Sequence, residues 1–356
     1  MKDSLQVIRR KIDVLDARLV KLISARAKIA QQVGRIKNGA LVYRPEREAQ
    51  VLRRVSDLNP GPMPSTSMRR IYVEIMSACR ALEDKLAVAY LGPEGTFSQD
   101  AATRHFGGSI AAYSCTTIDE VFKHVETATT GYGVVPVENS TDGAIGRTLD
   151  LLLTTPARVC GEIMLPVRQC LMSRAKNYAG IKKIYSHAQS LAQCQHWLAR
   201  HLPGAERIAV VSNAEAARMA SSEAHAGAIA SQTASILYKL NLLARNIQDE
   251  ARNITRFLVL AREDVAPSGH DKTSLIMSAR NVPGAMESLL SPLAKNNVSM
   301  TRLESRPART GRWEYLFYLD IEGHAHEARE ARALAEIETK ASFLKILGSY
   351  PASLTR

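Results

Sequence analysis

Two basic residues stand where the pattern of a long helix predicts a buried face. Apolar residues recur every three or four positions from Leu5 to Ile36, as one face of a helix requires. Arg26 occupies the position between Leu22 and Ile29 in this series. A buried charge without a partner is costly, so Arg26 either extends to solvent or meets an anion held among helices.

A second cation shares the direction of Arg26 on the predicted helix. Lys37 lies eleven residues later and, at about 100° per residue, returns to within about 20° of the same azimuth. Both cations can therefore point into one anion-binding cavity. Arg9, seventeen residues before Arg26, faces about 100° away, which would aim it toward a partner chain.

Polar and glycine-rich turns end several predicted strands. The stretches "GPEGTFS" (92–98), "ENSTDGAIG" (138–146) and "SHAQS" (186–190) each separate an apolar run from a helical pattern. Turns of this kind leave hydroxyl and backbone N–H groups where carboxylates or phosphates bind well. One such turn is usually a plain connection, whereas three in one region indicate a small anionic ligand. The step "NITRFLVL" (253–260) reads by itself as a strand-opening turn.

Composition limits the class of protein. The chain has 356 residues, of which 46% are hydrophobic, and this length supports one large core or two to three smaller ones. No apolar run approaches the about 18 residues that span a bilayer, so we expect a cytoplasmic protein without a membrane partner. The five cysteines form neither a close pair nor an even set, which predicts reduced, buried thiols.

Charge and motifs narrow the possible ligands. Residues 1–85 hold 18 Lys and Arg against nine Asp and Glu, a surplus that suits nucleic acid, a small polyanion or a solvated face. Neither "GxGxxG" nor "GxxxxGK[ST]" occurs, so we expect no dinucleotide or nucleoside triphosphate. The His, Cys and Asp residues lack metal-ligand spacing, and no cofactor or metal is predicted.

The hydrophobic pattern divides the chain into three regions. Residues 1–86 read as three helices without a compact core of their own, which favours intertwined dimerisation. Residues 87–264 repeat an apolar strand, a polar turn and a helix, which predicts a mostly parallel, helix-covered sheet with the ligand at the carboxyl ends of its strands. Residues 271–356 read β-α-β-β-α-β, a ferredoxin-like module.

Six motifs in collinear order carry a family resemblance over nearly the whole chain. They are "IRRKIDVLDARLVKLISARAKIAQQVGRIK", "YRPEREAQVL", "GPEGTFS", "VPVENSTDGAIG", "NITRF" and "LESRP". Together they resemble the bifunctional chorismate mutase/prephenate dehydratase family of phenylalanine biosynthesis. The resemblance implies a multidomain protein: an all-α chorismate mutase at 1–86, an α/β two-lobed dehydratase similar to periplasmic binding proteins at 87–264, and an α+β ACT domain at 271–356.

The resemblance also implies substrates, an effector and an assembly. Chorismate would be rearranged to prephenate, and prephenate converted to phenylpyruvate, with L-phenylalanine as feedback inhibitor acting through the ACT domain. The expected assembly is a homodimer, and no nucleic acid takes part. The alternative from another class is a non-catalytic, amino-acid-responsive regulator whose basic helices grip nucleic acid. Against it, the first helix is far longer than that of a helix-turn-helix, and Arg26 lies on its apolar face.

The implied mutase site is cationic, because chorismate is a dicarboxylate whose transition state develops negative charge at the ether oxygen. By similarity Arg26 and the partner-facing Arg9 clamp carboxylates, and Lys37 contacts the ether oxygen. By the same similarity Arg47 supports these substrate-binding residues, although without the resemblance Arg47 would be assigned to a solvated helix face. Glu48 accepts a hydrogen bond from the substrate hydroxyl. Glu83 stands where some relatives carry Gln and must be protonated to donate. Cys79 aligns with a Ser.

The implied dehydratase site centres on Thr255 of "NITRF", the family's catalytic threonine, which donates to the departing ring hydroxyl. A threonine is a weak general acid, so its role is orientation and hydrogen bonding more than full proton transfer. Arg256 is the candidate carboxylate anchor, and His187 is an alternative proton donor. The remaining expected cleft residues are Thr96, Asn139, Ser140, Gln189 and Ser190.

The implied effector site combines two motifs of the last region. "VPGAM" contributes Gly284, Ala285 and Met286 at the start of a helix, where glycine lets the backbone approach an amino acid. The family pattern usually has Leu at Met286, a change that conserves volume. "LESRP" contributes Glu304, Ser305, Arg306 and Pro307 on the neighbouring strand.

Overall fold

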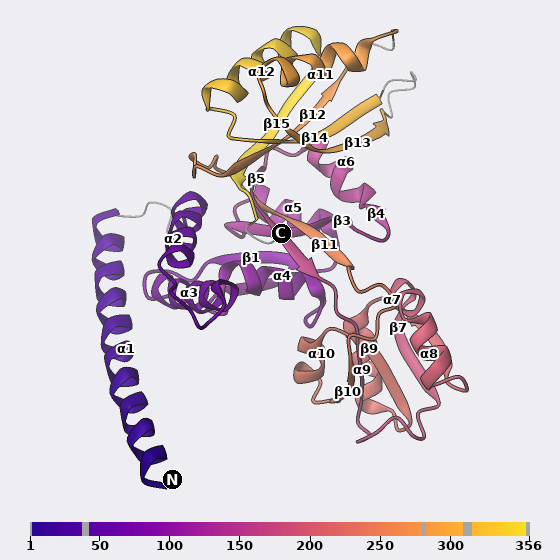
Figure 1. The fold of residues 1–356 in the computed structure, drawn as a ribbon. Coiled ribbons are helices and arrows are strands. Elements are labelled where there is room, and N and C mark those ends of the chain that lie inside the picture. Colours follow the sequence, from indigo (N-terminus) through magenta and orange to yellow (C-terminus); the bar gives the residue numbers. More distant parts are fainter. Residues whose placement is uncertain (1, 38–42, 280–281, 309–314, 354–356) are drawn as a thin grey trace. The chain divides into compact units, whose positions relative to one another are not determined.

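A computed structural model describes residues 2–37, 43–279, 282–308 and 315–353 (Figure 1). The chain divides into two compact units. The first comprises Met1–Arg44, Gln50–Leu86 and Thr103–Ala111, and the second comprises Pro45–Ala49, Ala87–Ala102 and Ala112–Arg356. None of the helices in the described part of the chain combines the length and apolar composition that crossing a bilayer needs.

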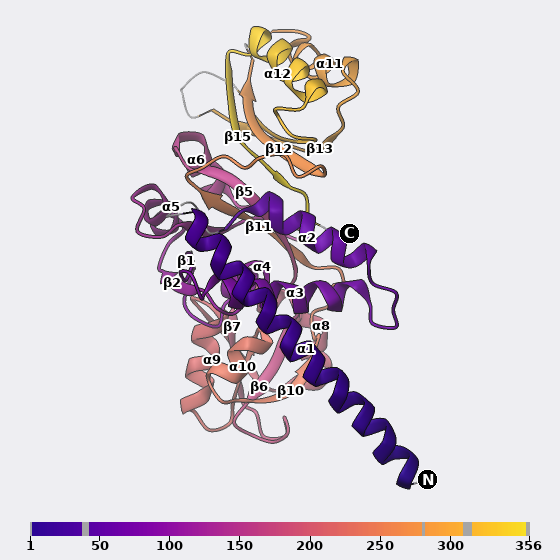
Figure 2. The same cartoon turned by 90° about the vertical axis from the view of Figure 1, so that its left-hand side faces the viewer.

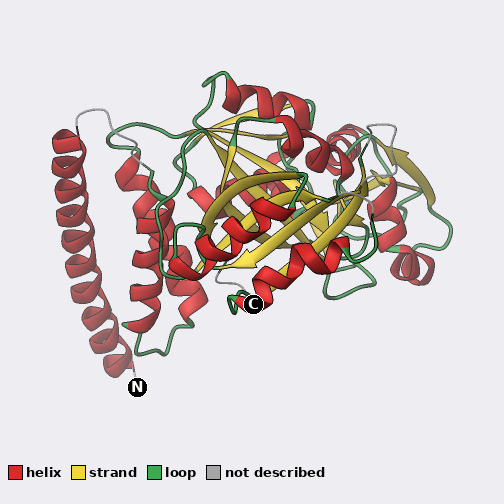
Figure 3. Cartoon of the chain, turned by 90° about the horizontal axis from the view of Figure 1, so that it is seen from above, coloured by secondary structure: helices red, strands yellow, loops and turns green. Residues whose placement is uncertain are grey.

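The three predicted amino-terminal helices are present as α1 (Lys2–Lys37), α2 (Pro45–Asp57) and α3 (Ser65–Arg80). The helix that begins at the N-terminus, α1, is one uninterrupted rod in Figure 3. Its predicted apolar stripe is exposed in the single chain: Leu5, Ile8, Ile12, Leu15, Leu19, Leu22, Ile29, Val33 and Ile36 each expose more than two-fifths of their surface. A stripe of this length on a soluble helix marks an interaction surface.

A buried aromatic cluster ties α3 to the segment 103–111 in the first unit. The Arg80 guanidinium is buried, donates to the Phe106 carbonyl at 2.5 Å and stacks over the Tyr43 ring. The Tyr43 hydroxyl lies 2.7 Å from His105 Nε2. Burial, together with the nearby Arg80 charge, lowers the pKa of His105 to about 4, so this imidazole is neutral at physiological pH.

The first sheet of the second unit has the strand order β2-β1-β3-β11-β5, with β4 paired to β3. Strands β1 and β3 are parallel, whereas β11 is inserted antiparallel between β3 and β5. The elements are β1 (Ala87–Leu91), α4 (Phe97–Phe106), β2 (Ala111–Cys115), α5 (Ile118–Glu126), β3 (Tyr132–Asn139), β4 (Gly143–Ala144), α6 (Gly146–Thr154), β5 (Arg158–Pro166) and β11 (Ile254–Ala261). We call this sheet and its helices lobe 1.

A second sheet forms lobe 2, with the order β10-β6-β9-β7-β8. The chain enters it after β5 and leaves it before β11, so two segments connect the lobes. The elements are β6 (Cys170–Ser173), β7 (Lys183–His187), α7 (Ala188–Gln193), α8 (Gln195–His201), β8 (Glu206–Val210), α9 (Asn213–Ser222), β9 (Ala226–Ala230), α10 (Gln232–Leu237) and β10 (Asn241–Arg245). The repeated strand–turn–helix units thus build two mixed sheets and not one parallel sheet.

The carboxyl-terminal region forms the predicted β-α-β-β-α-β module. Its antiparallel sheet has the order β13-β14-β12-β15, and α11 and α12 cover one face of it (Figure 1 and Figure 2). The elements are β12 (Asp271–Ser278), α11 (Ala285–Lys295), β13 (Met300–Pro307), β14 (Tyr315–Glu322), α12 (Ala328–Lys340) and β15 (Phe343–Pro351).

Both faces of this third sheet carry buried residues. Leu275 and Met277 pack under α11 and α12, whereas Ile276, Tyr318 and Tyr350 join the core of lobe 1. Alternate residues of one strand therefore serve two cores. The module shares hydrophobic surface with lobe 1 and is more tightly joined to it than an independent domain would be.

All five cysteines are free and buried, as predicted. Burial raises the pKa of the Cys115 thiol to about 11 and that of Cys194 to about 12. These thiols are therefore protonated and unreactive at neutral pH.

Candidate functional site

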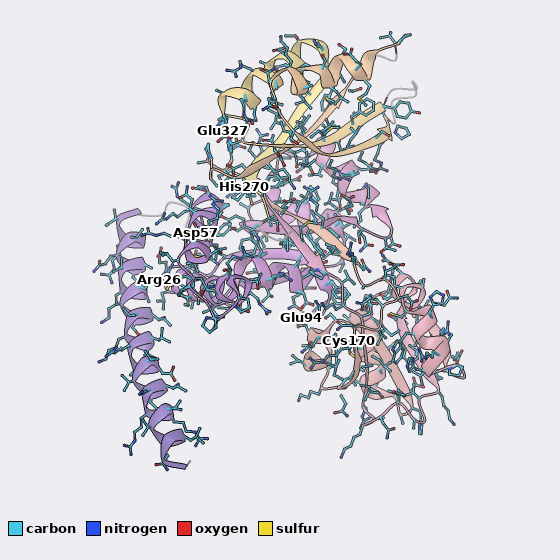
Figure 4. All side chains as sticks on the ribbon, in the orientation of Figure 1. Arg26, Asp57, Glu94, Cys170, His270 and Glu327 are labelled. Atoms are coloured by element: carbon cyan, nitrogen blue, oxygen red, sulfur yellow. The ribbon has the colours of Figure 1, made fainter. Side chains whose placement is uncertain are left out.

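Two of the predicted mutase residues, Arg26 and Glu83, each lie at a contact of α1 within the first unit. Arg26 is half-buried on α1, from which it projects in Figure 4, and its Nη1 donates to Cys79 Sγ on α3 at 3.2 Å. The Glu83 carboxyl group lies against Gly34 of α1, where an added Cβ would overlap it. Gly34 stands between Arg26 and Lys37 on the same helix, so Glu83 reaches the segment that carries both cations.

The other mutase positions stay predictions. Arg9 is exposed on α1, as a residue that serves a partner chain would be. Arg47 is exposed and Glu48 half-buried in the first turn of α2, which begins at Pro45, a residue favoured at that position. The side chain of Lys37 lies outside the described part of the structure.

In the second unit, Asn139 and Thr255 form a buried hydrogen-bonded pair. Asn139 ends β3, Thr255 is the second residue of β11, and the antiparallel register places them opposite each other. Asn139 Nδ2 donates to Thr255 Oγ1 at 2.8 Å and to Asn253 Oδ1 at 2.9 Å. Since Asn139 fills one lone pair of Thr255 Oγ1, the hydroxyl proton is left to donate elsewhere.

The turn after Asn139 fixes the orientation of this amide. Asn139 Oδ1 accepts from the backbone N–H groups of Thr141 at 3.0 Å and Asp142 at 3.2 Å. An Asn that bonds its own turn in this way has one defined amide orientation. Ser140 Oγ accepts from the Ile254 N–H and donates to the Arg252 carbonyl, so it joins the two strand ends and binds backbone.

Lobe 2 contributes a polar network around Ser190 on α7. Ser190 Oγ accepts from Gln169 Nε2 and from Asn213 Nδ2, each at 2.9 Å. Asn213 Oδ1 in turn accepts from the His187 backbone N–H at 3.0 Å. His187 thus enters the network through its main chain. Sequence analysis identified Ser190 and His187 but missed Gln169 and Asn213, which carry no motif of their own.

The two lobes are linked at Asp142. Gln189 Nε2 and Gln193 Nε2, both on α7, donate to Asp142 Oδ2, the latter at 3.2 Å. Asp142 lies three residues after Asn139, so this link adjoins the buried pair. The predicted cleft residues of the two lobes therefore meet along one seam. Thr96 lies apart from these contacts, and its hydroxyl donates to the Leu91 carbonyl at 3.1 Å.

Two buried polar atoms near this seam lack a hydrogen-bond partner among the described residues. They are Asn253 Nδ2 and Gln169 Oε1. Leaving such groups unpaired costs about 1–3 kcal/mol each. A polar ligand bound at the seam would satisfy them, and Asn253 is a further candidate site residue that sequence analysis did not select.

The structure does not place Arg256, the predicted anchor of a substrate carboxylate, beside Thr255 at the seam. Successive residues of a strand point to opposite faces, so Arg256 faces away from the side that Thr255 occupies. Its guanidinium is buried and forms ion pairs with Glu162 Oε2 at 2.9 Å and Asp320 Oδ2 at 2.5 Å. Although burial alone would lower the pKa of Arg256, its neighbours Tyr350, Asp320 and Glu162 raise it.

The third sheet carries a cavity of about 260 Å³ at the start of α11, within the described residues. Gly284 caps α11 with a left-handed φ of +78°, a conformation that disfavours any residue with a Cβ. Tyr315 and Phe317 of β14 supply aromatic wall. The cavity is lined by Ala279, Val282, Gly284, Ala285, Met286, Glu287, Tyr315 and Phe317.

The second predicted effector motif lies on β13 beside this cavity. Ser305 and Pro307 pair with Phe317 and Tyr315 of β14, so they flank its aromatic wall. Arg306 points to lobe 1, where its Nη1 donates to the Gly146 carbonyl at 2.7 Å and to Asp150 at 3.0 Å. The side chains of the motif therefore lie on both faces of the sheet. Glu304 is two residues from Arg306 on the strand, so both point to the same face.

One group among the described residues has metal-ligand geometry. Ligand atoms of Cys115, Glu120 and His124 lie within 4.8 Å of one another. Glu120 already accepts from Thr116 N at 2.7 Å and Thr116 Oγ1 at 2.9 Å at the beginning of α5. Its carboxylate is therefore part of a helix cap, and we assign no ligand to this group.

Comparison with known proteins matches three family models in chain order. They are chorismate mutase type II at residues 8–84, prephenate dehydratase at residues 88–265 and the ACT domain at residues 273–339. A bifunctional chorismate mutase/prephenate dehydratase from Neisseria gonorrhoeae is 50% identical over 349 residues. That alignment covers 97% of this chain and 96% of the relative.

Two solved structures resemble three-quarters of the chain. Prephenate dehydratase from Arthrobacter aurescens, in complex with L-Phe, is 31% identical with a TM-score of 0.69, covering 75% of this chain and 90% of that chain. GqqA, described as a novel type of quorum-quenching acylase, is 29% identical with a TM-score of 0.70, covering 75% of this chain and 98% of that chain.

Proposed function

Because the chain belongs to the bifunctional chorismate mutase/prephenate dehydratase family, we propose that it rearranges chorismate to prephenate and converts prephenate to phenylpyruvate. Residues 1–86 carry the first reaction, 87–264 the second, and 271–356 bind L-phenylalanine as feedback inhibitor. The observation that carries the proposal is the Asn139–Thr255 hydrogen bond of 2.8 Å at the seam between the lobes. The family assignment leaves the nucleic-acid-binding regulator without support.

The dehydratase step follows from the arrangement of this pair. Prephenate dianion takes up one proton and yields phenylpyruvate, CO₂ and water, and aromatisation of the ring drives the reaction. Breakage of the C–O bond leaves negative charge on the departing hydroxyl. The Thr255 hydroxyl, oriented by Asn139, donates to that oxygen where the charge develops. His187 as proton donor remains the alternative.

Uncharged donors bind the prephenate carboxylates in this proposal. Arg256 forms ion pairs with Glu162 and Asp320, so other groups, which face the seam, bind the carboxylates. The unpartnered Asn253 Nδ2 is the first of them. Gln189 and Ser190 on α7 contribute from lobe 2, and closure of the lobes on the substrate would exclude water from it.

The mutase step requires cations and one neutral donor. Arg26 and Lys37 bind the substrate carboxylates and the ether oxygen, and Arg9 of a second copy completes the clamp. Protonated Glu83 donates to the ether oxygen, which an ionised carboxylate cannot do. Arg47 supports the shell and Glu48 accepts the substrate hydroxyl.

A homodimer supplies the second copy of Arg9. The apolar stripe of α1 is exposed along the helix, and covering it with the same stripe of a partner would remove this surface from water. Because these side chains already hide part of their surface, covering each one contributes part of the about 1.5–3 kcal/mol that full burial of a leucine or isoleucine gives. We place the dimer in the cytoplasm, where the free cysteines of the chain would stay reduced.

Separation of the two activities tests the proposal. Arg26→Ala should abolish chorismate consumption while the variant still converts supplied prephenate to phenylpyruvate. Thr255→Val should do the reverse and accumulate prephenate from chorismate. If either variant lost both activities without unfolding, assignment of the reactions to separate sites would be wrong.

A further inference from the structure

The residues next to the Asn139–Thr255 pair face the third sheet. Glu138 precedes Asn139, Arg256 follows Thr255, and the antiparallel register pairs Glu138 with Arg256. Cross-strand partners lie on one face of a sheet, and adjacent residues lie on opposite faces. Each member of the buried pair is therefore one peptide unit away from a charged side chain on the reverse side of the same strands.

The third sheet presents a matching pair with the charges exchanged. Arg302 on β13 and Asp320 on β14 are register partners. Arg302 Nε donates to Glu138 Oε2 at 2.7 Å, and Arg256 Nη1 donates to Asp320 Oδ2 at 2.5 Å. Glu138, Arg256, Arg302 and Asp320 thus form two crossed ion pairs, which we call the charge quartet.

Further buried groups hold the charge quartet rigid. Arg256 Nη2 donates to the Tyr350 hydroxyl at 3.0 Å, and Ser274 Oγ contacts both Asp320 Oδ1 and the Tyr350 hydroxyl. Arg256 and Asp320 are at least nine-tenths buried. Removing one member of a buried, hydrogen-bonded ion pair leaves an uncompensated charge, so the arrangement tolerates little displacement.

The strands of the quartet also reach the cavity of the third sheet. Asp320 lies three residues from Phe317 on β14, and Arg302 lies three residues before Ser305 on β13. A ligand that shifts Phe317 or Ser305 moves β14, which carries Asp320, and β13, which carries Arg302. Contiguous packed strands of this kind can transmit a displacement between two sites.

We propose that Arg302 and Asp320 are positioning residues for the dehydratase reaction, which set the geometry of the Asn139–Thr255 pair through Glu138 and Arg256. The inference rests on the proposed function. The third-sheet module is accordingly part of the catalytic geometry and not only an appended sensor. Effector binding in the cavity lowers activity by displacing the charge quartet.

Asp320→Asn tests the inference with little change of shape. We expect kcat for prephenate to fall at least tenfold while KM changes less than threefold, because a misplaced Thr255 hydroxyl affects the transition state more than the bound substrate. The phenylalanine concentration for half-inhibition should rise at least fivefold, whereas the calorimetric Kd for phenylalanine stays within twofold. Arg302→Gln should act in the same direction.

Asp150→Asn is the matched control. Asp150 pairs with Arg306 at 3.0 Å across the same contact between lobe 1 and the third sheet, but it lies on α6 and is not a member of the charge quartet. This variant should keep kcat and half-inhibition within twofold. Equal effects of Asp150→Asn and Asp320→Asn would overturn the inference, since the response would then reflect docking of the module in general.

Hydrogen exchange gives a readout that needs no turnover. Phenylalanine should change the protection of the peptide that covers residues 253–258 in the wild type, and Asp320→Asn should abolish that change. An unchanged wild-type peptide, or a response that survives in Asp320→Asn, overturns the inference. Wild-type protein that fails to convert prephenate would instead contradict the proposed function, so the two failures are distinguishable.

Discussion

Replacing Thr255 by valine removes one hydroxyl and keeps the shape of the side chain. In the structure this hydroxyl accepts a hydrogen bond from Asn139 at 2.8 Å, and Thr255 is nine-tenths buried. The hydroxyl proton is therefore available to donate to a ligand at the seam. Losing a donor aimed at developing charge costs about 2.7–4 kcal/mol of transition-state stabilisation, or about 10²–10³ in kcat. KM should change little, because the leaving oxygen gains charge only as its bond breaks.

The assay measures phenylpyruvate formation from supplied prephenate, with chorismate consumption by the same preparation as internal control. Loss of the Asn139–Thr255 hydrogen bond should lower the free energy of unfolding by only about 1 kcal/mol, because Asn139 keeps Asn253 as partner. Thr255→Ser retains the donor and should keep kcat within about tenfold of wild type. A Thr255→Val variant with kcat within threefold of wild type would refute the role given to this hydroxyl.

Three predictions concern the first unit. Glu83→Gln should keep mutase activity, because the amide can donate to the ether oxygen, whereas Glu83→Ala removes the donor and should abolish it; equal activity of the two variants would exclude this role. Leu19→Glu on the exposed stripe should convert the dimer to monomer in light scattering and abolish mutase activity while prephenate turnover persists; a stable dimeric variant would contradict the proposed interface. The pKa of His105 is lowered to about 4 in the folded chain from about 6.5 when unfolded, so stability is complete above pH 6.5 and declines as the pH falls toward 4. His105→Gln should remove that part of the decline in thermal unfolding of the first unit, and an unchanged slope would show that this imidazole is not responsible.

The sequence predicted those helices and strands whose residue pattern fits only one kind of element. The three-to-four spacing from Leu5 to Ile36 predicted α1, and the β-α-β-β-α-β order predicted the third sheet. The division of residues 1–86 into three helices also agrees with the structure. These are local signals, which depend on neighbours along the chain.

The sequence could not predict contacts that depend on the return of β11 to lobe 1. Asn139 and Thr255 are 116 residues apart, and only the antiparallel insertion of β11 beside β3 makes them partners. The same insertion sets the direction in which Arg256 points. A strand with both faces buried gives no polar alternation, so the sequence does not reveal which face holds the ligand and which holds Glu162 and Asp320.

The most direct test of the account is a time course of purified protein with chorismate and no added cofactor, with and without L-phenylalanine. We expect prephenate to appear first, phenylpyruvate to follow, and phenylalanine to suppress phenylpyruvate formation. Prephenate that accumulates without phenylpyruvate would contradict the chemistry assigned to Asn139 and Thr255. Unconsumed chorismate would contradict the site assigned to Arg26 and Lys37.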